Sequence, residues 1–150
     1  MAASTTPLDG SMYLVSVSTD DGSTWDVLGF QKESNFSIAT ESREITSKTQ
    51  CAYREKVPTV STWTISGTAE FYNNDATDLV YNDLFDLRGT SVMLKVTPVI
   101  CSSGDPATGE FEYSGSGFFS QLDASFPEKE TASYAYTFEG SGTLTKAAIV

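Results

Sequence analysis

The chain has 150 residues, of which 39% are hydrophobic, and a net charge of −11 from 20 acidic and 9 basic side chains. This length suits one domain built around a single hydrophobic core. No apolar run approaches the ~20 residues that a membrane-spanning helix needs. The acidic balance is the opposite of the basic footprint typical of nucleic-acid-binding surfaces. We therefore expect one domain that neither enters a membrane nor binds nucleic acid specifically.

The residue types available for catalysis are few. The chain has no histidine, which excludes Ser-His-Asp and Cys-His arrangements. Its two cysteines, Cys51 and Cys101, are too few for a structural zinc site, and whether they are free stays open. Glu110 and Glu112 would lie ~7 Å apart on one strand face, a spacing that glycosidases use, but a solvated pair is the simpler interpretation. We expect no enzyme activity, no cofactor and no metal.

The first elements in chain order are an arm and a hairpin. Residues 1–10 are small and polar and lack the basic and apolar regions of a signal peptide, so we expect an N-terminal arm on a protein made in a cytoplasm. The apolar residues at 13, 15 and 17 predict a strand. Residues 20–23 are typical of a hairpin turn, because Asp and Gly tolerate a positive φ. The strand then resumes at residues 25–27.

Strand-like alternation recurs further along the chain. Phe36 and Ile38 predict a short strand, and residues 62–71 predict the clearest one, with apolar side chains on one face and mostly Thr and Ser on the other. Residues 40–60 do not fit this scheme, because they are largely polar. A loop of this length in a compact domain is usually functional. The alternative is an extended hairpin that orders only against a partner.

One helix is expected at residues 75–88. Asp75 is suited to the N-cap position, where its carboxylate can accept a backbone N–H. Gly89 favours termination. The apolar residues at helical spacing are Ala76, Leu79, Val80, Leu84 and Leu87. This helix would place one apolar stripe against a sheet.

The C-terminal half predicts three more strands. Residues 92–96 alternate and a proline follows them. Residues 111–126 form a long extended stretch, and residues 134–138 alternate aromatic side chains with small or polar ones. The glycines within residues 115–117 and 140–142 are typical of close backbone approach between strands, which we favour over a ligand-binding loop.

The charge is uneven along the chain. Residues 32–56 carry five bases and four acids, a balance of +1, whereas residues 66–150 carry four bases and 12 acids, a balance of −8. A near-neutral segment can be attracted to the acidic body of a neighbouring copy. A solvated loop of mixed charge is the alternative interpretation.

Three segments of the chain are informative when they are taken in order. The first is Tyr53-Arg54-Glu55 ahead of the strand at residues 63–70, and the second is the expected helix with the glycine that follows it. The third runs over residues 115–144 and contains Gly117-Phe118-Phe119, Phe126-Pro127-Glu128 and Phe138-Glu139-Gly140. In this order the segments resemble the major tail protein family of long-tailed phages, and the resemblance spans nearly the whole chain.

The resemblance implies a mainly β fold, a β-sandwich or half-barrel flanked by one short helix, in a single domain over residues 1–150. It implies a structural subunit that assembles as hexameric rings, stacked into a hollow tube through which DNA passes without specific binding. The implied partners are other copies of the chain, a tape-measure protein, a tail terminator and tail-tip or baseplate proteins. The implied location is the tail of a virion, after assembly in the host cytoplasm.

We expect residues 40–60 to form an arm that reaches an adjacent subunit or ring, because of their length, polarity and near-neutral charge. The candidate contact residues are Arg43, Glu44, Lys48, Tyr53, Arg54, Glu55 and Lys56. Residues 1–10 and a C-terminal tail at residues 145–150 are secondary candidates for contacts between rings.

Two alternatives stay open. The inner tube subunit of a contractile tail or injection system would share the fold, so the sequence discriminates poorly between the two kinds of tube. A β-sandwich module that binds carbohydrate would instead be a monomer with an exposed aromatic cluster.

Overall fold

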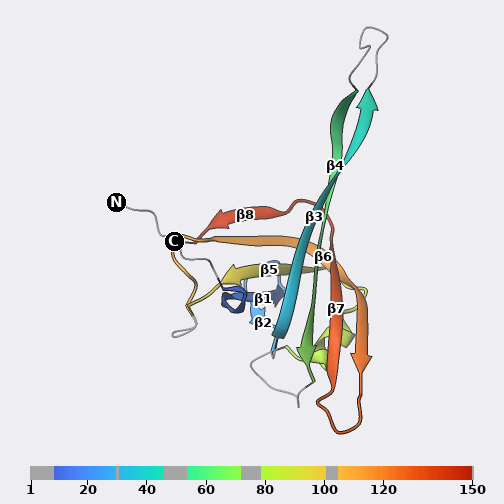
Figure 1. Cartoon of the computed structure of the whole chain (residues 1–150). Helices are drawn as coiled ribbons and strands as arrows, with labels where there is room; N and C mark the ends of the chain where they lie inside the picture. Colours follow the sequence, from blue (N-terminus) through green and yellow to red (C-terminus); the bar gives the residue numbers. More distant parts are fainter. Residues whose placement is uncertain (1–8, 30, 46–53, 72–78, 101–104, 150) are drawn as a thin grey trace.

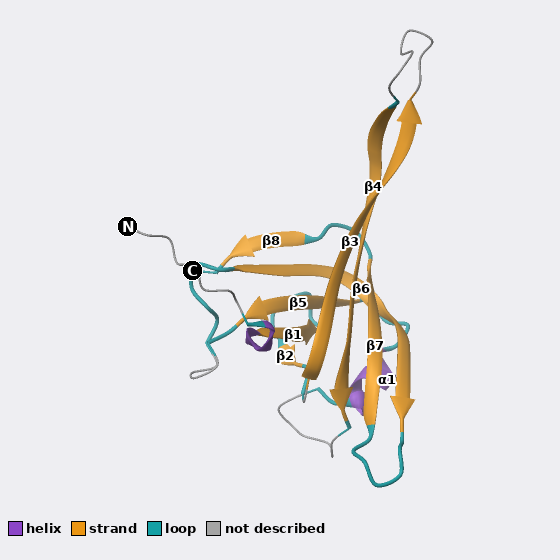
Figure 2. Cartoon of the chain, viewed as in Figure 1, coloured by secondary structure: helices purple, strands orange, loops and turns teal. Residues whose placement is uncertain are grey.

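The computed structural model describes residues 9–29, 31–45, 54–71, 79–100 and 105–149. Within them the chain is mainly β, with one short α-helix (Figures 1 and 2). The elements are the 3-10 helix Gly10–Met12, β1 Tyr13–Ser18, β2 Asp26–Val27, β3 Gln31–Ile45, β4 Glu55–Glu70, α1 Tyr81–Leu87, β5 Val92–Pro98, β6 Phe111–Ser125, β7 Ser133–Gly140 and β8 Thr145–Ala148.

The strands form one antiparallel sheet that bends back over itself. Its order is β2-β1-β5-β6-β7-β4-β3, with β8 paired to β6. Strand β6 belongs to both parts, because residues 113–117 pair with β5 and residues 117–125 pair with β7. We call β2, β1, β5, β8 and the start of β6 the first half-sheet, and the end of β6 with β7, β4 and β3 the second half-sheet. The two cross in Figure 1, so the expected half-barrel is confirmed, and it is not closed.

The hydrophobic core lies between the two half-sheets. Alternation places one face of each strand inward: the inward side chains include Trp63 and Ile65 of β4, Tyr134, Tyr136 and Phe138 of β7, Leu94 of β5 and Val15 of β1, and all of them are buried. The expected close backbone approach is confirmed at Gly117, where a Cβ would overlap the backbone carbonyl of Glu139 in β7. At Gly140 and Gly115 a Cβ would instead overlap the indole of Trp63. The Trp63 Nε1 donates a hydrogen bond to the Gly142 carbonyl at 3.3 Å.

The helix is shorter than expected at its start. Leu79 pairs with Leu28 in a parallel β-bridge, so helix α1 begins only at Tyr81. The Val80 N–H donates to Asp83 Oδ2 at 3.1 Å, which caps the first turn from within the helix. The expected start at residue 75 and the assignment of Leu79 and Val80 to the helix are therefore wrong for this element, and Asp75 itself lies outside the described residues. The end is confirmed, because Gly89 follows with φ +76°.

The other strand predictions are confirmed with one extension and one addition. The turn at residues 20–23 has positive φ at Asp21 and Gly22. The short strand around Phe36 is in fact the 15-residue strand β3. Residues 145–148, expected as part of a tail, pair with β6 as strand β8. In the described part of the chain, no helix has the length and apolar character needed to cross a membrane.

Candidate functional site

The segment at residues 40–60 is a hairpin in its described part. Strands β3 and β4 stay paired as far as Ile45 opposite Glu55, and the paired strands project away from the rest of the molecule (Figure 1). Thr40 and Ser61 hydrogen-bond across it through their hydroxyls at 2.9 Å, and the Thr59 hydroxyl donates to the Glu41 carbonyl at 3.1 Å. We call residues 40–45 and 54–60 the arm. Its ladder forms within one chain, so these residues need no partner to pair.

The structure brings some of the predicted contact residues together. Arg54 Nε lies 3.2 Å from Glu44 Oε1, with 78% and 40% of the two side chains exposed. Arg43 lies opposite Val57, Glu44 opposite Lys56, and Ile45 opposite Glu55. An ion pair this exposed contributes at most about 1 kcal/mol to folding, so these charges remain available for contacts outside the chain. Lys48 and Tyr53 lie outside the described residues.

The exposed apolar side chains of the arm were not predicted from the sequence, because the prediction used only its length, polarity and charge. Ile45, Val57 and Val60 are 44%, 38% and 54% exposed, and Ile38 at the base of the arm is 55% exposed. The aliphatic residues within an otherwise polar stretch are the sequence feature that indicates this apolar surface. An arm that projects from the body has no core to bury them against, so this surface is suited to contact with another protein.

Two strand edges of the second half-sheet have no partner among the described residues. One is the side of β3 that faces away from β4. The other is the last part of β6, from Phe118 to Ser125, because pairing with β5 ends at Gly117 while β7 continues along the other side. Unpaired N–H and C=O groups in a long edge are a template for adding another strand. These edges lie at opposite sides of the same four-stranded unit.

The solvent-facing side of the second half-sheet is small and polar. Its residues include Asn35, Ser37 and Ala39 in β3, Thr62, Thr64, Ser66 and Thr68 in β4, and Ala135 and Thr137 in β7, with Phe118 of β6 as a large exception. The carboxylates of Glu70 and Glu139 lie on it, and Lys32 is paired with Glu70 at 2.6 Å. Hydroxyls and carboxylates predominate on this face, which suits contact with water and gives phosphate groups little to bind.

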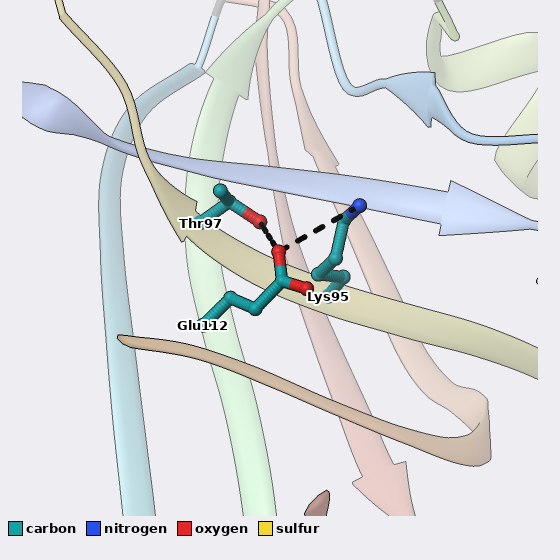
Figure 3. Close-up of polar contacts among 3 residues, drawn as sticks. All are labelled: Lys95, Thr97 and Glu112. Atoms are coloured by element: carbon teal, nitrogen blue, oxygen red, sulfur yellow. Dashed lines mark hydrogen bonds and ion pairs between the residues drawn. The ribbon is translucent and has the colours of Figure 1, made fainter. Parts of the chain in front are cut away.

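The first half-sheet contains a polar cluster with a structural role (Figure 3). Glu112 Oε2 accepts a hydrogen bond from the Thr97 hydroxyl at 3.3 Å and lies 4.0 Å from the Lys95 ammonium. That ammonium also lies 4.4 Å from the centre of the Trp25 ring. Glu112 thus contacts two side chains of the neighbouring strand β5, while Glu110 precedes β6 and is not part of it. The expected placement of both acids on one strand is therefore not observed.

Two phenols are buried in the core without a hydrogen-bond partner among the described residues, those of Tyr134 and Tyr136. Burial raises the pKa of Tyr134 to about 12. Burial also raises the pKa of Tyr136, and the neighbouring Tyr134 adds to that rise. Both groups are therefore neutral through the whole physiological range, and they serve packing.

Several solved structures of known proteins share this fold. The tail of an empty gene transfer agent particle with C6 symmetry is similar at a TM-score of 0.72 and 20% identity, over 95% of this chain and 100% of that one. The SPP1 tail tube is similar at a TM-score of 0.72 and 12% identity, over 96% of this chain and 81% of that one. A chain of the sheath-tube complex of PVC, an extracellular contractile injection system, is similar at a TM-score of 0.70 and 14% identity, over 99% of this chain and 100% of that one. At these identities the likeness is one of fold.

Sequence comparison is more specific. No curated protein matches the chain. A family model described as phage tail tube protein matches residues 7–146, which is nearly the whole chain and includes both the arm and the second half-sheet. The protein therefore belongs to the phage tail tube protein family.

Proposed function

We propose that the chain is a structural subunit that closes into rings by pairing the free edge of β3 with the free end of β6 in the next copy, and that the rings stack into a tube. The observation that supports this most directly is the pair of unpaired edges at opposite sides of one four-stranded unit. Ring closure would satisfy both edges, which would otherwise invite aggregation.

The strand directions favour this arrangement. Each neighbouring pair within the order β6-β7-β4-β3 is antiparallel, so the two outer strands, β6 and β3, run in opposite directions. Rotation of a copy about an axis roughly along the strands therefore brings its β6 antiparallel to β3 of the first. The ladder can continue from copy to copy without a change in type. We infer six copies per ring, in keeping with the C6 symmetry of the similar gene transfer agent tail.

The small, polar face of the second half-sheet is our candidate for the wall of the lumen. Its hydroxyls and carboxylates, on a chain of net charge −11, repel the phosphate backbone or leave it solvated. DNA would then pass without being held. The opposite face of this half-sheet covers the core and the helix, so it cannot line an aqueous channel.

The arm is our candidate for contact with an adjacent subunit or ring. Its exposed aliphatic residues would supply buried area, and Arg43, Glu44, Arg54, Glu55 and Lys56 would set the register, with Lys48 and Tyr53 as further candidates. Beyond copies of itself, we propose a tape-measure protein, a terminator and tail-tip or baseplate proteins as partners, in a virion tail assembled in the host cytoplasm. Among the similar solved structures are a tube terminator, a cap and a baseplate.

Assembly of the purified chain tests the proposal. Size-exclusion chromatography and negative-stain electron microscopy should show rings or hollow tubes above a threshold concentration. A protein that stays monomeric at every concentration would contradict it and would favour the carbohydrate-binding module. The tube of a contractile system is the second candidate, because the fold is about as similar to a chain of a contractile sheath-tube complex. Images of whole particles decide that point through the presence of a sheath.

The lumen assignment has its own test. In a variant with Cys51 and Cys101 replaced by serine, a single cysteine at Ser66 should react with a maleimide attached to a protein-sized polymer in the monomer and be shielded in tubes. A cysteine at Asp86 of helix α1 should react in both. Equal reaction at Ser66 before and after assembly would place this face outside the lumen.

A further inference from the structure

A hollow of about 250 Å³ lies where the sheet fails to close, between β3 and the first half-sheet. It is mostly apolar, and we call it the seam hollow. Its lining includes Tyr13, Ser34, Phe36, Val96 and Tyr113. The rings of Phe36 and Tyr113 stack with centroids 5.6 Å apart, yet Phe36 remains 37% exposed. A more polar hollow adjoins it and includes Glu33 in its lining.

A second hollow, of about 320 Å³, lies between helix α1 and the free edge of β6. We call it the helix hollow, and its lining includes Tyr81, Phe85, Arg88, Gln121 and Leu122. Phe85 is 44% exposed, and the Arg88 guanidinium lies 4.1 Å from the centre of its ring. The two side chains together form an apolar knob with a cationic cap beside an unpaired strand.

The two hollows lie at opposite ends of the same rows of the second half-sheet. One row of directly paired residues runs Ser34, Gly67, Tyr136, Leu122, and the next runs Phe36, Ile65, Phe138, Phe119. Both hollows are on the face of these rows that covers the core. If a neighbouring β6 continues the sheet beyond β3 without a large stagger, its helix hollow therefore faces the seam hollow.

We propose that the two hollows are the two halves of one contact between copies of this chain, in which Phe85 and Arg88 of one subunit close the seam hollow of the next. The inference rests on the proposed ring and names the side chains that hold it together. Arg88 makes no ion pair among the described residues, so no carboxylate of its own chain holds the guanidinium in place. The aromatic lining of the seam suits a stacked Phe–Arg pair.

Variants at the knob test this contact. Phe85→Ser and Arg88→Glu should each raise the concentration needed for half-assembly at least about tenfold, as expected for a central interface residue. Far-UV circular dichroism and the melting temperature should show a folded monomer. Unchanged assembly of both single variants would overturn the inference.

The chain offers a matched control. Phe111 is 43% exposed and also lies under a cation, with the Lys146 ammonium 4.3 Å from its ring centre, but it is on β6 in the first half-sheet and lines neither hollow. Phe111→Ser should leave the assembly threshold within about twofold of the original. If Phe111→Ser and Phe85→Ser impaired assembly equally, any exposed aromatic side chain would contribute to assembly, and the specific contact would be refuted.

Cross-linking gives an independent measurement. With Cys51 and Cys101 replaced by serine, a chain carrying both Ser34→Cys and Phe85→Cys should yield a ladder of covalent oligomers when assembled material is oxidised, while each single variant should yield none. If the chain assembles and no covalent oligomers form, the proposed contact is wrong and the proposed ring is unaffected. If the original chain never assembles, the proposed function itself fails.

Discussion

The side-chain amide of Gln31 hydrogen-bonds both backbone groups of Val15: the Val15 N–H donates to Gln31 Oε1 and Gln31 Nε2 donates to the Val15 carbonyl, each at 3.0 Å. Gln31 thereby occupies the place of a neighbouring strand at the point where β3 approaches β1. Its amide also donates to the Leu28 carbonyl at 2.7 Å. One polar side chain thus ties the two ends of the open sheet together.

Replacing Gln31 by leucine should therefore destabilise the monomer by about 2–3 kcal/mol, because the buried Val15 loses its side-chain partner. Urea unfolding followed by fluorescence measures the change. Gln121, which is exposed and whose side chain bonds only Asp123 within the described part of the chain, is the matched control, and Gln121→Leu should change stability by less than about 0.5 kcal/mol. Equal effects at the two positions would show that Gln31 does not tie the sheet.

Gly140 should not tolerate alanine. A Cβ there would overlap the indole of Trp63, which is buried and cannot move aside without disturbing Phe138 behind it. We expect Gly140→Ala to cost about 2–3 kcal/mol through overpacking. Gly10→Ala, at a position with no atom within 4 Å of the new Cβ, is the control and should be close to neutral. A melting temperature unchanged in Gly140→Ala would contradict the packing described.

The monomer should lose stability in alkali. An unfolded tyrosine titrates near pH 10, whereas Tyr134 has a pKa of about 12 in the fold and that of Tyr136 is also raised. The unfolded state therefore releases protons first, so stability is full below pH 10 and falls as pH rises from about 10 toward 12. The slope is at most about 1.4 kcal/mol per pH unit for each tyrosine.

The double variant Tyr134→Phe, Tyr136→Phe tests that origin. It should flatten the loss of stability between pH 10 and 12 in denaturant titrations. It should also be no less stable at pH 7, because the phenols it removes have no hydrogen-bond partner among the described residues. A slope that persists in the variant would assign the alkaline loss to other groups.

Deleting residues 43–57 should separate folding from assembly. The core contains no arm residue, so the shortened chain should remain a folded monomer with a near-original melting temperature. It should not polymerise, because the exposed Ile45 and Val57 and all the candidate charged contact residues of the arm are gone. Electron microscopy and chromatography give the readout. Tubes of normal length from the shortened chain would refute the role proposed for the arm.

The sequence alone determined which residues form most strands and which face each presents. Trp63, Ile65 and Phe138 share the buried faces of their strands because alternation follows from strand geometry, a local property of the backbone. Gly89 marked the end of the helix for an equally local reason, its tolerance of positive φ. The family resemblance was also readable, because it depends on the order of such segments.

Only the tertiary structure decided which strands are neighbours and where pairing stops. Leu79 is not part of the helix because it forms a β-bridge with Leu28, which is distant in sequence. The free end of β6 and the hydrogen bonds from Gln31 to Val15 depend on contacts between segments far apart in the chain, and the pairing of residues 40–45 with residues 55–61 extends a strand that the sequence predicts as short. Alternation reports the face of a strand and says nothing of its partner, so the edges that we propose for assembly became visible only once the sheet was complete.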